Sequence, residues 1–219
     1  MKRLLLLGAT GRTGRHAVDY ALSPEKQLEV CALVRTPAKL APRPGLTVVA
    51  GSPYERADVE RAIDGCDAVL GFLGHTGVAS ILGRTGDAPA DLLARAAENA
   101  AFAMRARGLR RIVVLSALGV GETRALLPWP LPSLVERGLL RASYADHAAQ
   151  EAVLRASGLD WTVVRAAMLA GRKLSRTRLS EHGEPAPRPF ISRRTVATFM
   201  VDSLLHPEFF GKALIASAD

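Results

Sequence analysis

A glycine-rich turn directly after a short apolar run constrains this chain more than any other feature. Four leucines occupy residues 4–7, and Gly8-Ala9-Thr10-Gly11-Arg12-Thr13-Gly14 follows them and opens a helical pattern. Gly8 allows a tight turn out of a strand, because it can adopt backbone angles that other residues avoid. Gly11 lets a ligand approach the backbone, and Gly14 lets the helix pack close to the sheet. The order of strand, glycine turn and helix predicts an anion-binding βα unit.

The start of that helix has free backbone N–H groups and the positive end of the helix dipole. A dinucleotide pyrophosphate is the anion that this arrangement predicts, in contrast to an ordinary glycine-rich turn. The cofactor-binding residues predicted in the turn are Gly8, Thr10, Gly11, Arg12, Thr13 and Gly14. Arg12 and Arg15 either touch phosphates or lie solvated on the helix face.

The rest of the chain alternates apolar runs with helical patterns. Strands are expected over 3–7, 28–34, 46–50, 67–73, 112–115, 161–165 and 212–216, and helices over 13–22, 55–63, 88–107, 143–156 and 194–205. Loops are expected at 74–86, around 128–132 and over a looser stretch, 166–191. The strands lack polar alternation, so both faces of the sheet should be buried. We therefore predict an α/β Rossmann-type fold with a doubly wound parallel sheet.

Length and composition fit one such domain. The chain has 219 residues, 48% hydrophobic and 23% charged, so residues 1–219 are expected to form a single NAD(P)-binding domain whose C-terminal part, 166–219, contributes to a substrate cleft. The net charge is +8, but the basic residues are scattered, and no nucleic-acid partner is expected. No metal-ligand spacing and no membrane span is evident. A cytoplasmic monomer or small homo-oligomer with two buried thiols, Cys31 and Cys66, is the expectation.

The residue after the second apolar run indicates which dinucleotide is preferred. A protein that binds NAD usually has Asp or Glu there, about 20 residues past the glycine turn, to bind the ribose 2′-OH. This chain has Arg35, followed by Lys39. A guanidinium can bind a 2′-phosphate that a carboxylate would repel, so NADP(H) is the expected cofactor. The alternative is a surface arginine at a strand end.

Ligands of such sheets bind beyond the carboxyl ends of the strands, so strand ends nominate further site residues. The additional cofactor-binding candidates are Ser52, Leu73, Gly74, His75, Ser116 and His147. Ser52 stands where related dinucleotide-binding proteins usually carry an Asp near the adenine amine, so its contact with the cofactor is expected to be weaker. His75 either contacts substrate or is a solvated loop histidine.

The motifs together resemble the atypical branch of the short-chain dehydrogenase/reductase superfamily that includes flavin reductase (biliverdin-IXβ reductase) and NmrA-like proteins. The resemblance rests first on Gly8–Gly14 with its G-x-x-G-x-x-G spacing and next on 154–165. It is supported by 33–35, 67–69 with 73–74, 113–117, 146–147 and 191–197. It implies an NADPH site, a shallow open cleft, and reduction of flavins, quinones or linear tetrapyrroles by direct hydride transfer.

The resemblance also nominates catalytic residues. Short-chain dehydrogenases place a serine at the position of Ser116, where it assists a Tyr-x-x-x-Lys pair. Here Tyr144 is present, but Ala148 stands in place of the lysine. Tyr144 is therefore either catalytic or a packing residue. The candidate catalytic residues are Ser116, Tyr144 and His147, with water as an alternative proton source.

Two departures limit what the resemblance implies. Ala166-Ala167 replaces a usual proline, and Met168 stands near where flavin reductases have a histidine. The apolar loop 117–132 forms either a lid or an oligomer contact. The sequence predicts an NADPH-dependent reductase of a planar small molecule. An NADP(H)-sensing regulator without turnover is the alternative, and a sugar epimerase or dehydratase is a weaker third.

Overall fold

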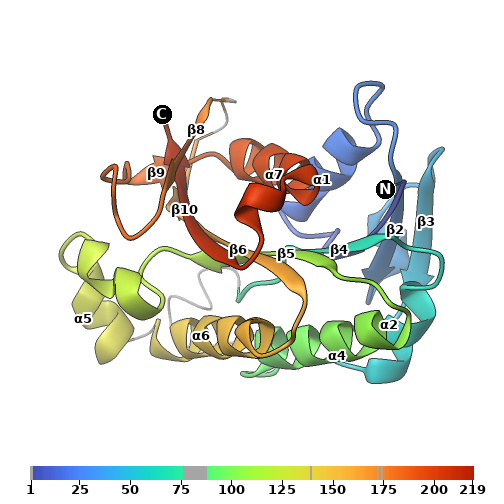
Figure 1. Cartoon of the computed structure of the whole chain (residues 1–219), viewed down its shortest axis with the longest axis horizontal. Coiled ribbons are helices and arrows are strands. Elements are labelled where there is room, and N and C mark those ends of the chain that lie inside the picture. The colour runs from blue at the N-terminus through green and yellow to red at the C-terminus, as the bar shows by residue number, and fades with distance from the viewer. Residues whose placement is uncertain (1, 76–87, 139, 172, 174) are drawn as a thin grey trace.

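The computed structural model describes residues 2–75, 88–138, 140–171, 173 and 175–219. Its centre is one eight-stranded sheet in the order β3-β2-β1-β4-β5-β6-β10-β8 (Figure 1). Seven strands run parallel, and β8 pairs antiparallel to β10 at one edge. The strands are β1 (Arg3–Leu7), β2 (Glu29–Val34), β3 (Leu46–Ala50), β4 (Ala68–Gly71), β5 (Arg111–Ala117), β6 (Asp160–Ala166), β8 (Thr177–Ser180) and β10 (Lys212–Ala218). The prediction of a doubly wound, mainly parallel sheet is confirmed.

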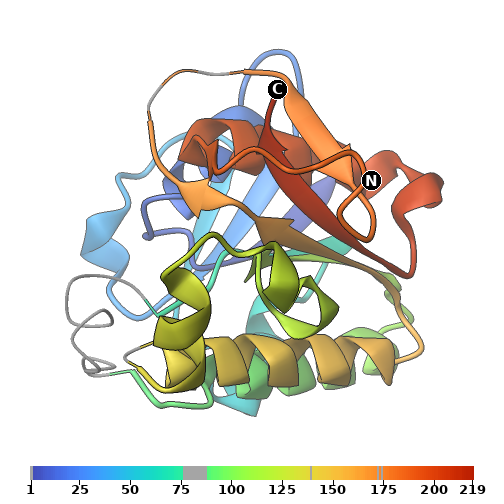
Figure 2. The same ribbon diagram turned by 90° about the vertical axis from the view of Figure 1, so that its left-hand side faces the viewer.

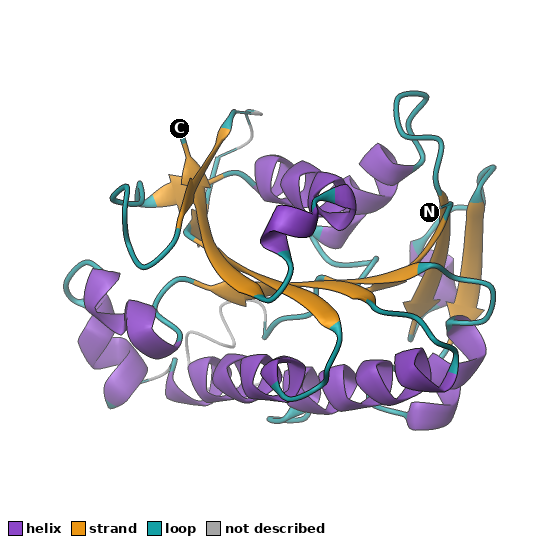
Figure 3. Cartoon of the chain, in the orientation of Figure 1, coloured by secondary structure: helices purple, strands orange, loops and turns teal. Residues whose placement is uncertain are grey.

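Helices cover both faces of the sheet. On one face lie α1 (Gly14–Ala21) and α7 (Arg193–Asp202), and on the other α2 (Arg56–Ala62), α4 (Leu92–Ala106) and α6 (Arg141–Arg155) (Figure 1). Viewed from the side of α5 (Leu131–Glu136), the sheet separates these two layers (Figure 2). Short 3-10 helices in the described part of the chain lie at Pro37–Lys39, Gly121–Leu126, Ser203–Leu205 and Pro207–Phe209. Figure 3 shows the helices and strands of the chain by colour.

The leucine run of β1 shows why the strands are apolar on both sides. Leu4 and Leu6 pack under α1 and α7, whereas Leu5 and Leu7 belong to the core on the side of α2 and α4. Successive side chains of a strand point to opposite faces, so a strand covered twice needs apolar residues at every position. No helix in the described part of the chain has the length and apolar content needed to cross a bilayer.

Several local expectations were incomplete. The stretch 166–191 contains β8 and also a two-stranded parallel pair, β7 (Met168–Leu169) with β9 (Phe190–Ile191). The proline-rich segment continues into α5, where Pro132 fits the first turn because that turn needs no N–H from it. Pro89 disfavours helical backbone at Ala88, and the helix expected from residue 88 begins at Leu92. Most of the expected loop 74–86 lies outside the described residues.

Candidate functional site

The glycine turn after β1 has the geometry that its sequence predicts. Gly8 has a φ of +87°, and a Cβ there would lie 2.7 Å from the carbonyl oxygen of Phe72. A Cβ on Gly14 would overlap the carbonyl oxygen of Gly8, so only glycine allows α1 to start this close to the strand. Gly11 donates its N–H to the Gly8 carbonyl, 3.0 Å away, which closes the turn. Larger residues at these positions would force the turn open.

The start of α1 is left open to a ligand. Thr13 is the N-cap residue, but its side chain makes no capping hydrogen bond. The N–H groups of Arg12 and Thr13 donate to no backbone carbonyl in the described part of the chain. Arg15 is exposed and donates to the carbonyls of Thr10 and Lys39, at 3.2 and 3.0 Å. The turn therefore keeps unsatisfied donors at the positive end of α1, as an anion site requires.

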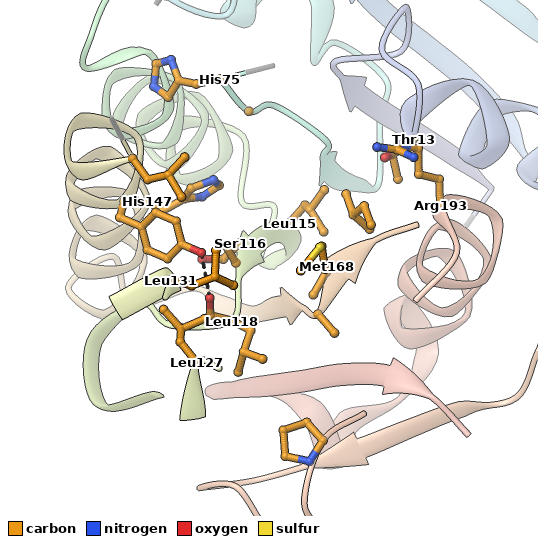
Figure 4. A pocket seen from close by; sticks show the side chains of 18 of the residues that line it. Thr13, His75, Leu115, Ser116, Leu118, Leu127, Leu131, His147, Met168 and Arg193 are labelled. Atoms are coloured by element: carbon orange, nitrogen blue, oxygen red, sulfur yellow. Dashed lines mark hydrogen bonds between the residues drawn. The ribbon is translucent and has the colours of Figure 1, made fainter. Parts of the chain in front are cut away.

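A cavity of about 680 Å³ begins at this turn and runs across the carboxyl ends of β4, β5 and β6. Its volume is in the range of small-molecule sites. Figure 4 shows that residues from both helical layers contribute to it. The predicted site residues that line it are Gly11, Arg12, Thr13, Leu73, Gly74, His75, Ser116, Tyr144 and His147. The C-terminal part of the chain contributes Ala166–Leu169, Pro187–Pro189 and Arg193.

The predicted cofactor-binding residues Arg35, Lys39 and Ser52 do not line this cavity. Arg35 follows β2 and Ser52 follows β3, and the pairing of Val34 with Ala50 places them at the same edge of the sheet. Arg35 and Lys39 are exposed. Ser52 is half-buried, and its Oγ accepts the N–H of Tyr54 at 3.3 Å. Gly8, Thr10 and Gly14 form the framework of the turn itself.

Ser116 is buried at the end of β5, and its hydroxyl is committed to a carboxylate. The Oγ–H donates to Glu151 Oε1 at 2.7 Å, and the same oxygen accepts Arg165 Nε at 3.0 Å. Arg165 NH2 also donates to Glu151 Oε2 at 2.6 Å. An ionised carboxylate can only accept hydrogen bonds, so it fixes the direction of the serine proton. Ser116 therefore presents only acceptor lone pairs to the cavity.

Arg165 connects this carboxylate to the surface. It is only 1% exposed and is paired with Ser116 across β5 and β6. Its second contact is Glu122, at 2.7 and 3.2 Å, and this contact lowers the pKa of Glu122 to about 2. Burial would lower the pKa of Arg165, but the hydrogen bonds to Glu151 and Glu122 outweigh it and raise that pKa. Both carboxylates thus hold Arg165 charged beneath Ser116.

Tyr144 also directs its proton away from the cavity centre. Its hydroxyl donates to the carbonyl oxygen of Leu118 at 3.1 Å (Figure 4). A carbonyl oxygen only accepts, so the phenol must be the donor. Burial raises the pKa of Tyr144, and Ala148 supplies no ammonium to lower it. Tyr144 lines the cavity and at the same time holds the segment after β5 against α6.

The two cavity histidines differ in their surroundings. His147 points from α6 toward the cavity (Figure 4), and burial lowers its pKa to about 4, so it is neutral at pH 7. His75 Nε2 lies 2.7 Å from Asp146 Oδ2, with both side chains buried. Asp146 also accepts the N–H groups of Leu93 and Ala94 at the start of α4. Burial raises the pKa of Asp146, but these hydrogen bonds outweigh it and keep that pKa below its usual range.

The outer half of the cavity is apolar. Leu118, Leu126, Leu127 and Leu131 come from the segment after β5, and Met168 faces them while remaining 48% exposed. This segment is the loop expected to be a lid or an oligomer contact, and it does form one wall of the cavity. Trp129 in the same segment is 87% exposed. A flat apolar ligand would be enclosed by these walls.

Comparison with known proteins decides the family. The model of the NAD(P)H-binding family matches residues 8–207. The chain belongs to the NAD(P)H-binding family. This agrees with the resemblance seen in the sequence, and the chain has the fold of NAD(P)-binding oxidoreductases. It is therefore an NAD(P)H-binding-family protein whose glycine turn, cavity and Ser116 lie where the dinucleotide-binding edge of such a sheet is found.

Solved structures with this fold cover nearly the whole chain. A Rossmann-fold NAD(P)-binding family protein from Shigella flexneri is 24% identical, with 100% of this chain and 94% of that chain covered and a TM-score of 0.73. A wide-type short-chain dehydrogenase/reductase from Veillonella parvula, in complex with NADP, is 17% identical (99% and 94% covered, TM-score 0.80). ChuY, an anaerobillin reductase from Escherichia coli O157:H7, is 19% identical (99% and 97% covered, TM-score 0.76). At these identities they show the shared fold.

Several residues of this family member's site were missed by sequence reasoning. Glu151 could have been found, because it follows Tyr144 and His147 by seven and four positions on α6 and so shares their face. Arg165 was recognised as a strand residue, but its role depends on Glu151 and Glu122, which are distant in sequence. The remaining missed residues are Asp146, Arg188 and Arg193.

Proposed function

We propose that the chain is an NADPH-dependent reductase that transfers hydride to a planar acceptor such as a flavin, a quinone or a linear tetrapyrrole. One observation carries the proposal: the cavity is continuous from the anion-binding turn at Gly11–Thr13 to the apolar walls around Leu127 and Met168. A dinucleotide and an apolar ligand can thus occupy one space. NADPH, when bound, supplies the hydride, and this chain supplies binding and orientation.

The residues present fit a dinucleotide. The open amides at the start of α1 and the side chains of Arg12 and Thr13 suit the pyrophosphate. Among the described residues, no heavy atom lies within 4 Å of the position that a Cβ on Gly74 would take, and Gly74 lines the cavity, so its backbone suits a close approach by a ligand. Arg35, with Lys39, suits a 2′-phosphate, and this is the basis for choosing NADP(H) over NAD(H).

The groups around Ser116 suit a reduction that does not need a strong acid. Ser116 donates to Glu151, Tyr144 donates to Leu118, and His147 is neutral, so each of the nominated catalytic residues offers the cavity an acceptor or a neutral ring. In this proposal Ser116 orients a ligand by accepting an N–H or O–H group. A delocalised acceptor spreads negative charge over its rings, and water can supply the proton.

Anaerobic stopped-flow absorbance tests the proposal. NADPH and, separately, NADH are mixed with the protein and with FMN, a naphthoquinone or biliverdin. We expect oxidation of NADPH well above a protein-free blank and faster than oxidation of NADH. The variant Arg35→Ala should reduce the preference for NADPH, and Arg43→Ala, an exposed arginine that pairs with Asp19, serves as the control. Tight NADPH binding without oxidation of it by any acceptor would contradict the proposal.

A second candidate is a regulator that senses the ratio of NADPH to NADP⁺ without turnover. The observation in its favour is that the protons of Ser116 and Tyr144 both point into the protein. A carbonyl reductase needs a donor that faces its substrate. Turnover that falls in Ser116→Ala would count against the sensor.

A further inference from the structure

Two arginines line the cavity beside the glycine turn. Arg12 belongs to the turn, and Arg193 is the first residue of α7. Both line the cavity, and no Asp or Glu is among the described residues that line it. Figure 4 shows the Arg193 side chain running from α7 toward Thr13 at the start of α1. Positive groups from the glycine turn and from α7 therefore lie on the same part of the cavity wall.

This arrangement is electrostatically unfavourable without a ligand. A cation at the first position of a helix opposes that helix's dipole, and Arg193 also faces the positive end of α1. Burial lowers the pKa of Arg193, and the nearby charge of Arg12 lowers it further. Ser192 caps α7 by accepting the Thr195 N–H at 3.0 Å, so Arg193 is not needed to start the helix. A bound anion would relieve these costs.

We propose that Arg193 completes an oxyanion site at the glycine turn and contacts the bound group from the side opposite that turn. The ligand is a phosphoryl or carboxylate group, which a guanidinium binds through two parallel N–H donors. The inference rests on the proposed function, because the group belongs either to the dinucleotide or to an acidic acceptor in the same cavity. Arg193 is then a binding residue and not a surface arginine.

Matched arginine variants test the site. Arg194 is the next residue of α7, is exposed and does not line the cavity, so Arg194→Gln removes the same charge from the same helix. Calorimetric titration with NADP⁺ should show binding roughly tenfold weaker or worse for Arg193→Gln, and within about twofold of wild type for Arg194→Gln. Arg193→Lys keeps the charge without the fork and should fall between them. Circular dichroism checks that each variant is folded.

A second titration identifies the source of the oxyanion. FMN and riboflavin differ by one phosphate, and each is titrated with NADP⁺ saturating. Weaker NADP⁺ binding in Arg193→Gln assigns the group to the dinucleotide. Weaker FMN binding, with riboflavin and NADP⁺ unchanged, assigns it to the acceptor. Equal losses in the Arg193 and Arg194 variants, or no loss in either, overturn the oxyanion site but leave the reductase proposal intact if wild type oxidises NADPH. Wild-type protein that binds none of these ligands overturns both.

Discussion

Two buried arginines lie at opposite ends of the parallel strands and differ in their partners. The strands begin at one side of the sheet, the amino edge, and end at the other side, the carboxyl edge. Arg111, at the start of β5, donates to the carbonyl oxygens of Ser203, Leu204 and Asp160, and its pKa is lowered by burial to about 10. Arg165, near the end of β6, is held by two carboxylates, and its pKa is raised. Arg111 is thus held by neutral backbone carbonyls, whereas Arg165 belongs to a charged network in contact with Ser116. We conclude that the charged network around Arg165 borders the cavity, whereas Arg111 joins β5 to β6 and to the segment after α7, away from the cavity.

The largest effect should follow from breaking the charged network. Arg165→Met leaves Glu151 buried without its main counter-charge, and we expect the free energy of unfolding to fall by about 4 kcal/mol. Urea unfolding at pH 7 measures this. The double variant Arg165→Met/Glu151→Met removes both charges and should recover most of the loss. A loss below about 1 kcal/mol in the single variant would mean that the network is not important for stability.

Acid should weaken the carboxyl edge through His147. Its pKa is about 4 in the folded protein and about 6.5 when unfolded, so the unfolded chain binds the extra proton. His147 therefore makes its full contribution to the free energy of unfolding above pH 6.5. That free energy should fall by about 3 kcal/mol as the pH drops to 4. Urea unfolding across this range measures it. In His147→Gln the slope between pH 6.5 and 4 should flatten, and an unchanged slope would assign the loss to other groups.

Removing Arg111 should lower the free energy of unfolding less than removing Arg165 and should leave NADPH oxidation unchanged. Arg111→Met leaves buried carbonyl oxygens of Ser203 and Leu204 without their donor, which should lower the free energy of unfolding by about 2 kcal/mol. The value of kcat/KM for NADPH oxidation per folded molecule should remain that of wild type. A clear change in kcat/KM would show that the two edges are not functionally separate.

The smallest effect on stability, but a clear effect on turnover, is expected at Ser116. Ser116→Ala removes one hydrogen bond to a carboxylate that keeps its arginine, so the free energy of unfolding should change by about 1 kcal/mol or less. Turnover of NADPH with FMN should fall roughly tenfold. Ser203→Ala, a buried serine at the amino edge, is the matched control and should keep full activity. Equal turnover in the two variants would remove Ser116 from the site.

The features that the sequence predicted correctly are those whose signal lies within a few neighbouring residues. The glycine turn and the apolar strands carry their information within a few residues, and both were confirmed. The strand β8 and the helix α5 were missed, because both are short and α5 starts among prolines. The contact of Ser116 with Glu151 joins residues 35 positions apart, so no local pattern could give it. The roles of Arg35, Lys39 and Ser52 stay predictions.

The exposure of Trp129 gives this protein two optical probes that answer different questions. The chain has two tryptophans, and the other, Trp161, is 8% exposed under the guanidinium of Arg155. Trp129 stands in solvent beside Pro128 and Leu131, which line the cavity. Emission from Trp129 should respond when a chromophoric ligand enters, whereas emission from Trp161 should change only when β6 unfolds. Replacing either residue by phenylalanine would give a single-tryptophan protein that reports occupancy or folding separately.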